Sequence, residues 1–93
     1  MSVAATIERR LRDRFAPVRL SIIDDSSRHA GHAGAQPGGE THFTVTITAT
    51  AFAGLGRVAR QRLVYATLAQ ELAEGVHALS LTTLAPGEDG APG

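Results

Sequence analysis

The sequence predicts a small α+β domain in which a three-stranded mixed sheet carries its helices on one face, in the order helix, strand, strand, helix, strand. Three patterns predict this class. Apolar residues recur at every fourth position near the N-terminus, threonines alternate with apolar residues over positions 43–50, and a broad apolar arc runs along a helical pattern over positions 57–73. The chain has 93 residues, and 43% of them are hydrophobic, which is enough for one domain with a single core.

The first helix is expected over residues 3–15, with Ser2 as its N-cap and Pro17 as the residue that ends it. Its apolar residues, spaced by four, are Ile7, Leu11 and Phe15. A strand is expected next, over residues 18–24, because apolar and polar residues alternate there. The apolar face of this strand carries Val18, Leu20 and Ile22.

Residues 25–40 separate the first two strands and carry four glycines and one proline. This composition predicts a long, flexible loop in place of a tight hairpin turn. A loop of this length is uncommon in a compact domain unless it has a function. It contains His29 and His32, and His42 follows it directly. His77, the fourth histidine, opens a late apolar run. Four histidines and no cysteine in so short a chain point to imidazole chemistry.

The second strand is expected to begin at Phe43, where threonines alternate with apolar residues and favour a strand with one buried face. That face carries Phe43, Val45, Ile47 and Ala49. The first two strands are expected to pair antiparallel. The second strand, the main helix and a third strand over residues 76–83 then form a β-α-β unit with parallel strands. Leu79 and Leu81 share one face of the third strand.

The main helix is expected over residues 57–73, after a turn at residues 52–56 and before Gly75, which ends it. Its apolar arc comprises Val58, Ala59, Leu63, Tyr65, Ala66, Ala69 and Leu72. Arg62 falls inside this arc, whereas Arg57, Arg60 and Glu71 fall outside it. The folded domain is expected to span residues 1–85. Residues 86–93 are rich in Gly, Pro and acidic residues and are expected to form a disordered tail.

Charge and composition favour some classes of function over others. The formal net charge is zero, and all nine basic residues are arginine. General polyanion binding depends on basic residues that displace counterions, so a neutral chain is poorly suited to it. No segment is apolar over the roughly 20 residues that a membrane-spanning helix needs, so a cytoplasmic protein without membrane contact is expected. An enzyme is not expected, because the chain has no cysteine nucleophile, no lysine-bearing phosphate loop and no paired carboxylates near the histidines.

Six short motifs, which follow one another along most of the chain, resemble those of the BolA family. They are Asp25-Ser26-Ser27-Arg28-His29, Glu40-Thr41-His42-Phe43, Phe52-Ala53-Gly54, Arg60-Gln61-Arg62-Leu63-Val64-Tyr65, Leu68-Ala69-Gln70-Glu71-Leu72 and Val76-His77-Ala78-Leu79. The resemblance covers residues 7–86 and departs from the family's pattern at Gln61, where a histidine is common. It implies the family's class II KH-like α+β fold, which agrees with the order of elements expected above.

The resemblance also implies a partner and a cofactor. Members of the family act with a monothiol glutaredoxin and share a 2Fe-2S cluster with it, in cluster trafficking or in iron and redox regulation. The glutaredoxin and a glutathione supply thiolates, and this chain is expected to supply His77 and one loop residue, either His29 or His32. Since the chain has no cysteine, it can offer imidazoles but cannot hold such a cluster alone. The same three histidines with a water would also suit a tetrahedral zinc site, a further hypothesis.

The arginines support an alternative function, that of a DNA-binding transcriptional regulator with a helix-turn-helix over residues 52–72. In that hypothesis Arg57, Arg60 and Arg62 contact phosphates. Gly54-Leu55-Gly56 lacks the spacing of the KH backbone clamp, and a neutral chain predicts only weak, salt-dependent DNA binding. The same arginines also suit the carboxylates of glutathione or of an acidic partner surface.

Overall fold

The computed structural model of the protein describes residues 2–24, 42–76 and 78–88. Its first helix, α1, spans Val3–Phe15, as predicted, and the Ser2 hydroxyl accepts a hydrogen bond from the Ala5 N–H at 3.1 Å. The helix ends at Ala16, which adopts a left-handed conformation with φ 44° and donates its N–H to the Arg12 carbonyl. Pro17 accounts for this end, because proline disfavours a right-handed helical conformation in the residue before it.

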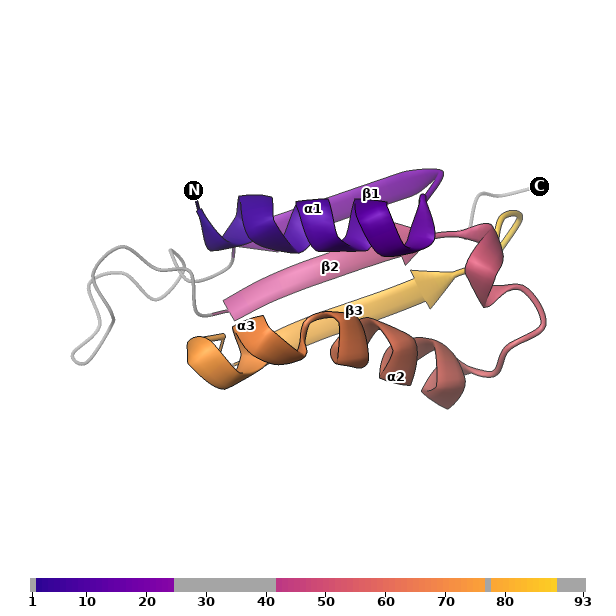
Figure 1. Cartoon of the computed structure of the whole chain (residues 1–93). Helices are drawn as coiled ribbons and strands as arrows, with labels where there is room; N and C mark the ends of the chain where they lie inside the picture. Colours follow the sequence, from indigo (N-terminus) through magenta and orange to yellow (C-terminus); the bar gives the residue numbers. More distant parts are fainter. Residues whose placement is uncertain (1, 25–41, 77, 89–93) are drawn as a thin grey trace.

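The three strands form one mixed sheet, which confirms the predicted topology. They are β1 (Arg19–Asp24), β2 (His42–Thr48) and β3 (Ala78–Leu84). The sheet order is β1-β2-β3, with β1 antiparallel and β3 parallel to the central strand β2 (Figure 1). The third strand was expected from residue 76, but the Val76 N–H donates to the Glu71 carbonyl at 3.1 Å and so closes the preceding helix.

Both helical segments pack on one face of the sheet, as predicted. The buried residues of α1 and of the helices α2 (Arg57–Thr67) and α3 (Ala69–Glu74) form one core with the apolar face of β2. A short 3-10 helix, η2 (Thr50–Phe52), precedes the predicted turn and buries Phe52, whose ring lies 5.1 Å from that of Phe15. The main members of this core are Ile7, Leu11, Phe15, Phe43, Val45, Ile47, Ala49, Phe52, Val64 and Leu68.

The opposite face of the sheet carries mostly hydroxyl side chains. We call it the open face, because the helices that the structure describes all pack against the other side (Figure 1). Its side chains alternate with those of the core along each strand. They are Arg19, Ser21 and Ile23 of β1, His42, Thr44, Thr46 and Thr48 of β2, and Ala78, Ser80, Thr82 and Leu84 of β3.

The prediction that Val18 belongs to a buried strand face is wrong. Its side chain is 63% exposed, and β1 begins one residue later. The Val18 N–H does pair with the Thr48 carbonyl at 2.9 Å, so the backbone follows the sheet. Residue 18 lies in the reversal between α1 and β1, before the strand begins.

The single main helix expected over residues 57–73 is instead two helices, α2 and α3, which meet at Leu68. Leu68 is buried and has φ −103° and ψ 16°, outside the helical range. The Thr67 hydroxyl donates to the Leu63 carbonyl at 2.8 Å, a bond from side chain to backbone that often bends helices. Gly75 ends α3, as predicted.

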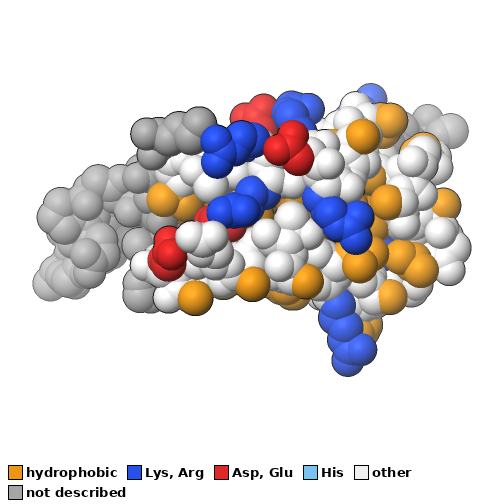
Figure 2. Space-filling view, in the orientation of Figure 1, with side chains coloured by type: hydrophobic (Ala, Val, Ile, Leu, Met, Phe, Trp, Pro, Cys, Tyr) orange, Lys and Arg blue, Asp and Glu red, His pale blue; other side chains and the backbone are white. Residues whose placement is uncertain are grey.

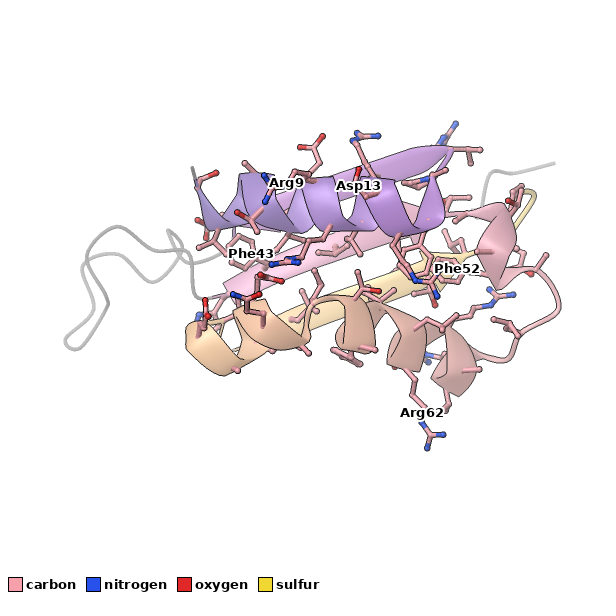
Figure 3. All side chains as sticks on the ribbon, in the orientation of Figure 1. Arg9, Asp13, Phe43, Phe52 and Arg62 are labelled. Carbon is pink, nitrogen blue, oxygen red and sulfur yellow. The ribbon has the colours of Figure 1, made fainter. Side chains whose placement is uncertain are left out.

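The predicted apolar arc of this segment is right for Leu63 and Leu72, which pack against the core, and wrong for Val58 and Tyr65, which are exposed. Val64, Leu68 and Glu71 are buried, whereas Val58 is 62% exposed and the predicted arc member Arg62 is exposed. Figure 3 shows Arg62 projecting away from the domain, while Phe43 and Phe52 lie between the helices and the sheet. Alanines and other apolar residues occur on most sides of this segment, so periodicity alone did not identify the side that packs on the core.

Candidate functional site

Three segments of the chain meet at one end of the sheet. In the β1–β2 register Asp24 lies opposite Phe43, and in the β2–β3 register His42 lies opposite Ala78. The last residue of β1 and the first residues of β2 and β3 are therefore neighbours. We call this region, defined by Asp24, His42 and Ala78, the entry end of the sheet. The segment between β1 and β2 leaves and rejoins the sheet here, next to the point where the chain enters β3 (Figure 1).

The predicted ligands belong to the segments that reach the entry end. His29 and His32 fall between β1 and β2, and His77 directly precedes β3, but all three lie outside the described residues. The structure therefore brings together the residues that flank the predicted ligands. Among the residues that it does describe, no group of three or more His, Cys, Asp or Glu side chains could hold a metal ion.

The chain is anchored on both sides of position 77. Val76 is buried in the core, and the N–H groups of Gly75 and Val76 both donate to the Glu71 carbonyl at 3.1 Å. On the other side, Ala78 pairs with His42 at the start of the parallel ladder. His42 itself is half-buried. We expect His42 to form a structural hydrogen bond and not to act as a ligand, because it lies on the polar face of β2 with Thr44 and Thr46.

The Glu71 side chain of α3 binds Arg10 of α1 and so links the two helices. The predicted apolar arc had placed Glu71 outside the buried side. The Arg10 Nε of α1 donates to Glu71 Oε2 at 2.8 Å, and an Arg10 terminal N–H donates to the Gln70 side chain at 3.0 Å. The Glu71 side chain is 8% exposed, and its other oxygen has no hydrogen-bond partner among the described residues. This contact fixes α3, and with it the chain that leads to position 77.

The three arginines of α2 do not act as one group. Arg57 and Arg62 are exposed, whereas the Arg60 guanidinium binds the Leu55 carbonyl at 2.8 Å and both oxygens of Glu88 at 2.6 and 3.1 Å. A further, longer bond of 3.3 Å joins Arg60 to the Thr83 carbonyl. Arg60 therefore connects the start of α2 to the residues that follow β3.

The Glu88 carboxylate is bound from two sides. The hydrogen bonds from Arg60, and then that from the Ala85 N–H at 3.0 Å, lower the pKa of Glu88 from 4.5 to about 2. The Glu88 N–H also donates to the Ala85 carbonyl, which closes a turn. The sequence had assigned residue 88 to the tail, and an acidic residue after a Pro-Gly turn was the only sign of this contact. Residues 89–93 lie outside the described range.

Arginine and carboxylate side chains are mixed on the surface of α1. The Arg12 Nε donates to Glu8 Oε2 at 2.8 Å, and both side chains are about half exposed. On the face shown in Figure 2, blue and red side chains lie next to one another over this helix.

None of the described helices is long and apolar enough to cross a membrane.

Comparison with known proteins identifies the family. The family model described as BolA-like protein matches residues 11–88. The chain is 47% identical over 92 residues to the "uncharacterized protein in cobS 5'region" of Sinorhizobium sp, with 95% of this chain and 96% of that protein covered. It is 47% identical over 77 residues to the "DNA-binding transcriptional regulator BolA" of Vibrio cholerae, with 83% of this chain and 69% of that protein covered.

A solved structure agrees with these matches. BolA1 from Arabidopsis thaliana superposes with a TM-score of 0.84 at 40% identity, over 99% of this chain and 98% of that one. Sequence, family model and fold give the same result over nearly the whole length of the chain. The chain therefore belongs to the BolA family.

Proposed function

We propose that this BolA family protein partners a monothiol glutaredoxin and shares a 2Fe-2S cluster with it and with glutathione, in cluster trafficking or in iron and redox regulation. The observation that carries the proposal is the entry end of the sheet. There, the ends of the segment that contains His29 and His32 lie beside the start of β3, directly after His77 in sequence. The segment between β1 and β2 and the residue before β3, which contain the predicted ligands, thus both border the entry end.

The side chains of this protein can supply some of the ligands that a 2Fe-2S cluster needs, but not all of them. A 2Fe-2S cluster is usually held by four ligands, and a protein without cysteine contributes imidazoles and needs a partner for thiolates. His77 and either His29 or His32 would be this chain's ligands. When bound, the cluster supplies one-electron chemistry, at a reduction potential that imidazole ligands raise.

The two kinds of histidine are expected to contribute unequally. The chain around His77 is held by the buried Val76 and by the pairing of Ala78. A ligand on a held backbone loses less conformational entropy on binding than a ligand in a long glycine-rich segment. We infer that His77 is obligatory, and that His29 and His32 can partly replace each other.

The test is an anaerobic mixture of the protein, a monothiol glutaredoxin, glutathione, iron and sulfide, followed by absorption and circular dichroism. His77→Ala should abolish the imidazole-type spectrum of the mixed complex. His29→Ala should weaken it, and the double variant with His32→Ala should remove the remainder. His42→Ala is the matched control, because it removes the fourth histidine and should leave the spectrum in place. An unchanged spectrum and pH dependence in folded His77→Ala would refute the ligand assignment.

A second candidate function is DNA binding, because the related Vibrio cholerae protein is named a DNA-binding transcriptional regulator and Arg57 and Arg62 are exposed on α2. Arg60 forms an ion pair with Glu88, so only Arg57 and Arg62 of the three predicted arginines are left to contact phosphates. Binding supported by so few cations should be weak and steeply dependent on salt. Sequence-specific, salt-tolerant binding in a mobility-shift titration would make this the leading function.

A further inference from the structure

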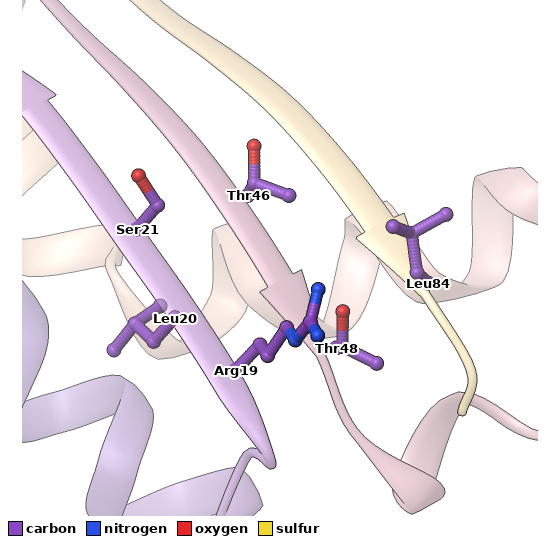
Figure 4. A pocket seen from close by; sticks show the side chains of 6 residues that line it. All are labelled: Arg19, Leu20, Ser21, Thr46, Thr48 and Leu84. Carbon is purple, nitrogen blue, oxygen red and sulfur yellow. The ribbon is translucent and has the colours of Figure 1, made fainter. Parts of the chain in front are cut away.

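The strand β3 forms one edge of the sheet, with β2 on one side and no described strand on the other (Figure 4). In a parallel pair, the backbone groups of alternate residues point toward the neighbouring strand and those of the residues between them point away. The Ala49 N–H donates to the Leu84 carbonyl at 3.0 Å, so the even-numbered residues of β3 face β2. The outward backbone groups therefore belong to Leu79, Leu81 and Thr83.

One end of this edge is already closed. The Arg60 guanidinium donates to the Thr83 carbonyl at 3.3 Å, and Thr83 is buried. Leu79 and Leu81 are only half-buried, whereas the core-facing residues of β2 are at most 2% exposed. Within the described part of the chain, the outward N–H and C=O groups of Leu79 and Leu81 have no hydrogen-bond partner. The open stretch of the edge thus covers residues 79–82.

The sequence of β3 lacks the features that usually protect an exposed edge from pairing with another chain. Protected edges carry charged residues, prolines or bulges. The other edge strand, β1, begins with Arg19 and ends with Asp24, but β3 has no charged residue, proline or glycine among its seven residues. Leu79 and Leu81 pack toward the helices, and the small residues between and after them are exposed on the open face. A further strand with the same alternation would continue both faces of the sheet.

The helix α2 lies beside this edge and determines which charge an added strand should carry. The contact of Arg60 with Thr83 joins the two elements, and α2 contains three arginines and no acidic residue. Arg57 and Arg62 are exposed and have no ion-pair partner among the described residues. Antiparallel pairing of two β3 strands about a two-fold axis would place two α2 helices on the same face, with their like charges together. The charge of α2 therefore favours an acidic segment of another protein over a second copy of this chain.

We propose that the edge of β3 binds an extended segment of a partner protein as a fourth strand of the sheet. The segment has alternating apolar and hydroxyl residues and carboxylates at its ends. Its backbone exchanges hydrogen bonds with Leu79 and Leu81, and its carboxylates are attracted by Arg57 and Arg62. Strand addition of this kind is a common mode of peptide recognition. The inference uses none of the predicted cluster ligands, so it does not depend on the proposed function.

The test uses a synthetic peptide with the sequence of residues 78–84 and aspartates at both ends. It is titrated into the isotope-labelled protein without iron, sulfide or glutaredoxin. Amide hydrogen exchange should slow at Leu79 and Leu81 and change little at Ser80 and Thr82, whose N–H groups already pair with β2. Lysines in place of the aspartates should weaken binding about fivefold or more.

N-methylated peptides test the backbone contacts. Methylation of one alternate set of peptide N–H groups should abolish binding, because these groups face β3, and methylation of the other set should spare it. The proposal fails if the amides of Leu79 and Leu81 are not protected, or if both methylated peptides bind equally. Protection of these amides that grows with protein concentration, without any peptide, would identify a second copy as the occupant and overturn the proposal.

Variants test the residues. Leu81→Pro removes an outward N–H and no bond to β2, so it should weaken peptide binding about tenfold. Leu81→Ala is the matched control, because it shortens the same side chain and keeps the N–H. Arg62→Gln should weaken binding of the aspartate peptide about two- to fivefold, whereas Arg12→Gln on α1 should not. Equal binding by the two Leu81 variants would overturn the assignment, and the methylated peptides decide it if Leu81→Pro does not fold.

Discussion

The side chain of Arg60 shows how one residue can join three segments of the fold. Its guanidinium joins the carbonyl of Leu55, before α2, to the carbonyl of Thr83 in β3 and to the Glu88 carboxylate. An arginine presents several donors in a fixed plane, so one side chain can bind acceptors from three segments. The residues after β3 are thus attached to the start of α2 as far as Glu88.

The lowered pKa of Glu88 predicts a specific dependence of stability on pH. Its carboxyl has a pKa of about 2 in the folded protein, against an ordinary value of 4.5, so the ionised form favours folding. This contribution is complete above pH 4.5 and is lost as the pH falls through about 2. Glu88→Gln should therefore lower the free energy of unfolding at neutral pH and have progressively less effect below pH 4.5, in urea denaturation experiments.

The control for this prediction is the same substitution in an Arg60→Gln background. If the guanidinium is the main cause of the lowered pKa, Glu88→Gln should have a smaller effect there. An effect of Glu88→Gln that stays constant down to pH 2, or that grows as the pH falls, would contradict the assignment.

At the scale of elements, the helical segment after β2 shows an apolar surface on its exposed side. Val58 and Tyr65 are exposed on α2, while Val64 of the same helix is fully buried. Two valines of one helix thus occupy opposite environments. The predicted arc included the exposed Val58 and omitted the buried Val64, although it correctly included Leu63 and Leu72.

This arrangement makes the two valines a matched pair. Val64→Ala should lower the free energy of unfolding by about 2 kcal/mol, through lost burial of two methyl groups and the cavity left behind. Val58→Ala should change it by less than about 0.5 kcal/mol, since the side chain is exposed and alanine favours the helix. Urea denaturation of both variants measures the difference. Equal losses in the two variants, or a larger loss at Val58, would contradict the assignment of the buried side.

The elements that the sequence could predict are those that local chemistry determines. The first helix has a serine cap, one apolar stripe and a following proline, and β2 has a strict alternation. The buried side of α2 and α3 depends instead on partners far away in sequence, such as Arg10 for Glu71. The row of Arg19, Thr48 and Leu84 across the sheet could not be predicted either, because it depends on the strand register. The histidines were visible in the sequence, but only the topology shows that Asp24, His42 and Ala78, which border the segments that contain His29, His32 and His77, meet at one end of the sheet.

At the scale of the whole molecule, α1 and α3 are connected across the domain by Arg10 and Glu71. The contact joins the first described helix to the last, on the face of the sheet that both helices cover. One oxygen of the buried Glu71 depends on this arginine for its hydrogen bond. Losing one partner of such a pair leaves a buried charge without compensation.

A double-mutant cycle tests this connection. Arg10→Leu alone should cost about 1–3 kcal/mol, because the buried carboxylate loses a charged hydrogen bond. The double variant with Glu71→Leu should cost less than the sum of the single variants. The exposed pair Arg12 and Glu8 is the control and should couple by less than about 1 kcal/mol. Additive effects at Arg10 and Glu71 would show that the contact does not stabilise the fold.

The central position of β2 also has a kinetic and evolutionary consequence. Its pairing with β3 joins residues separated by both α2 and α3, and its pairing with β1 spans residues 25–41, so neither pairing can form from a tight hairpin. Such non-local pairing makes folding slower than in a helical domain of the same size. The entropy of loop closure, however, grows slowly, by about 0.6 kcal/mol for each doubling of loop length. Folding therefore constrains the length of the segment between β1 and β2 only weakly, and insertions or deletions there can be selected almost independently of the sheet.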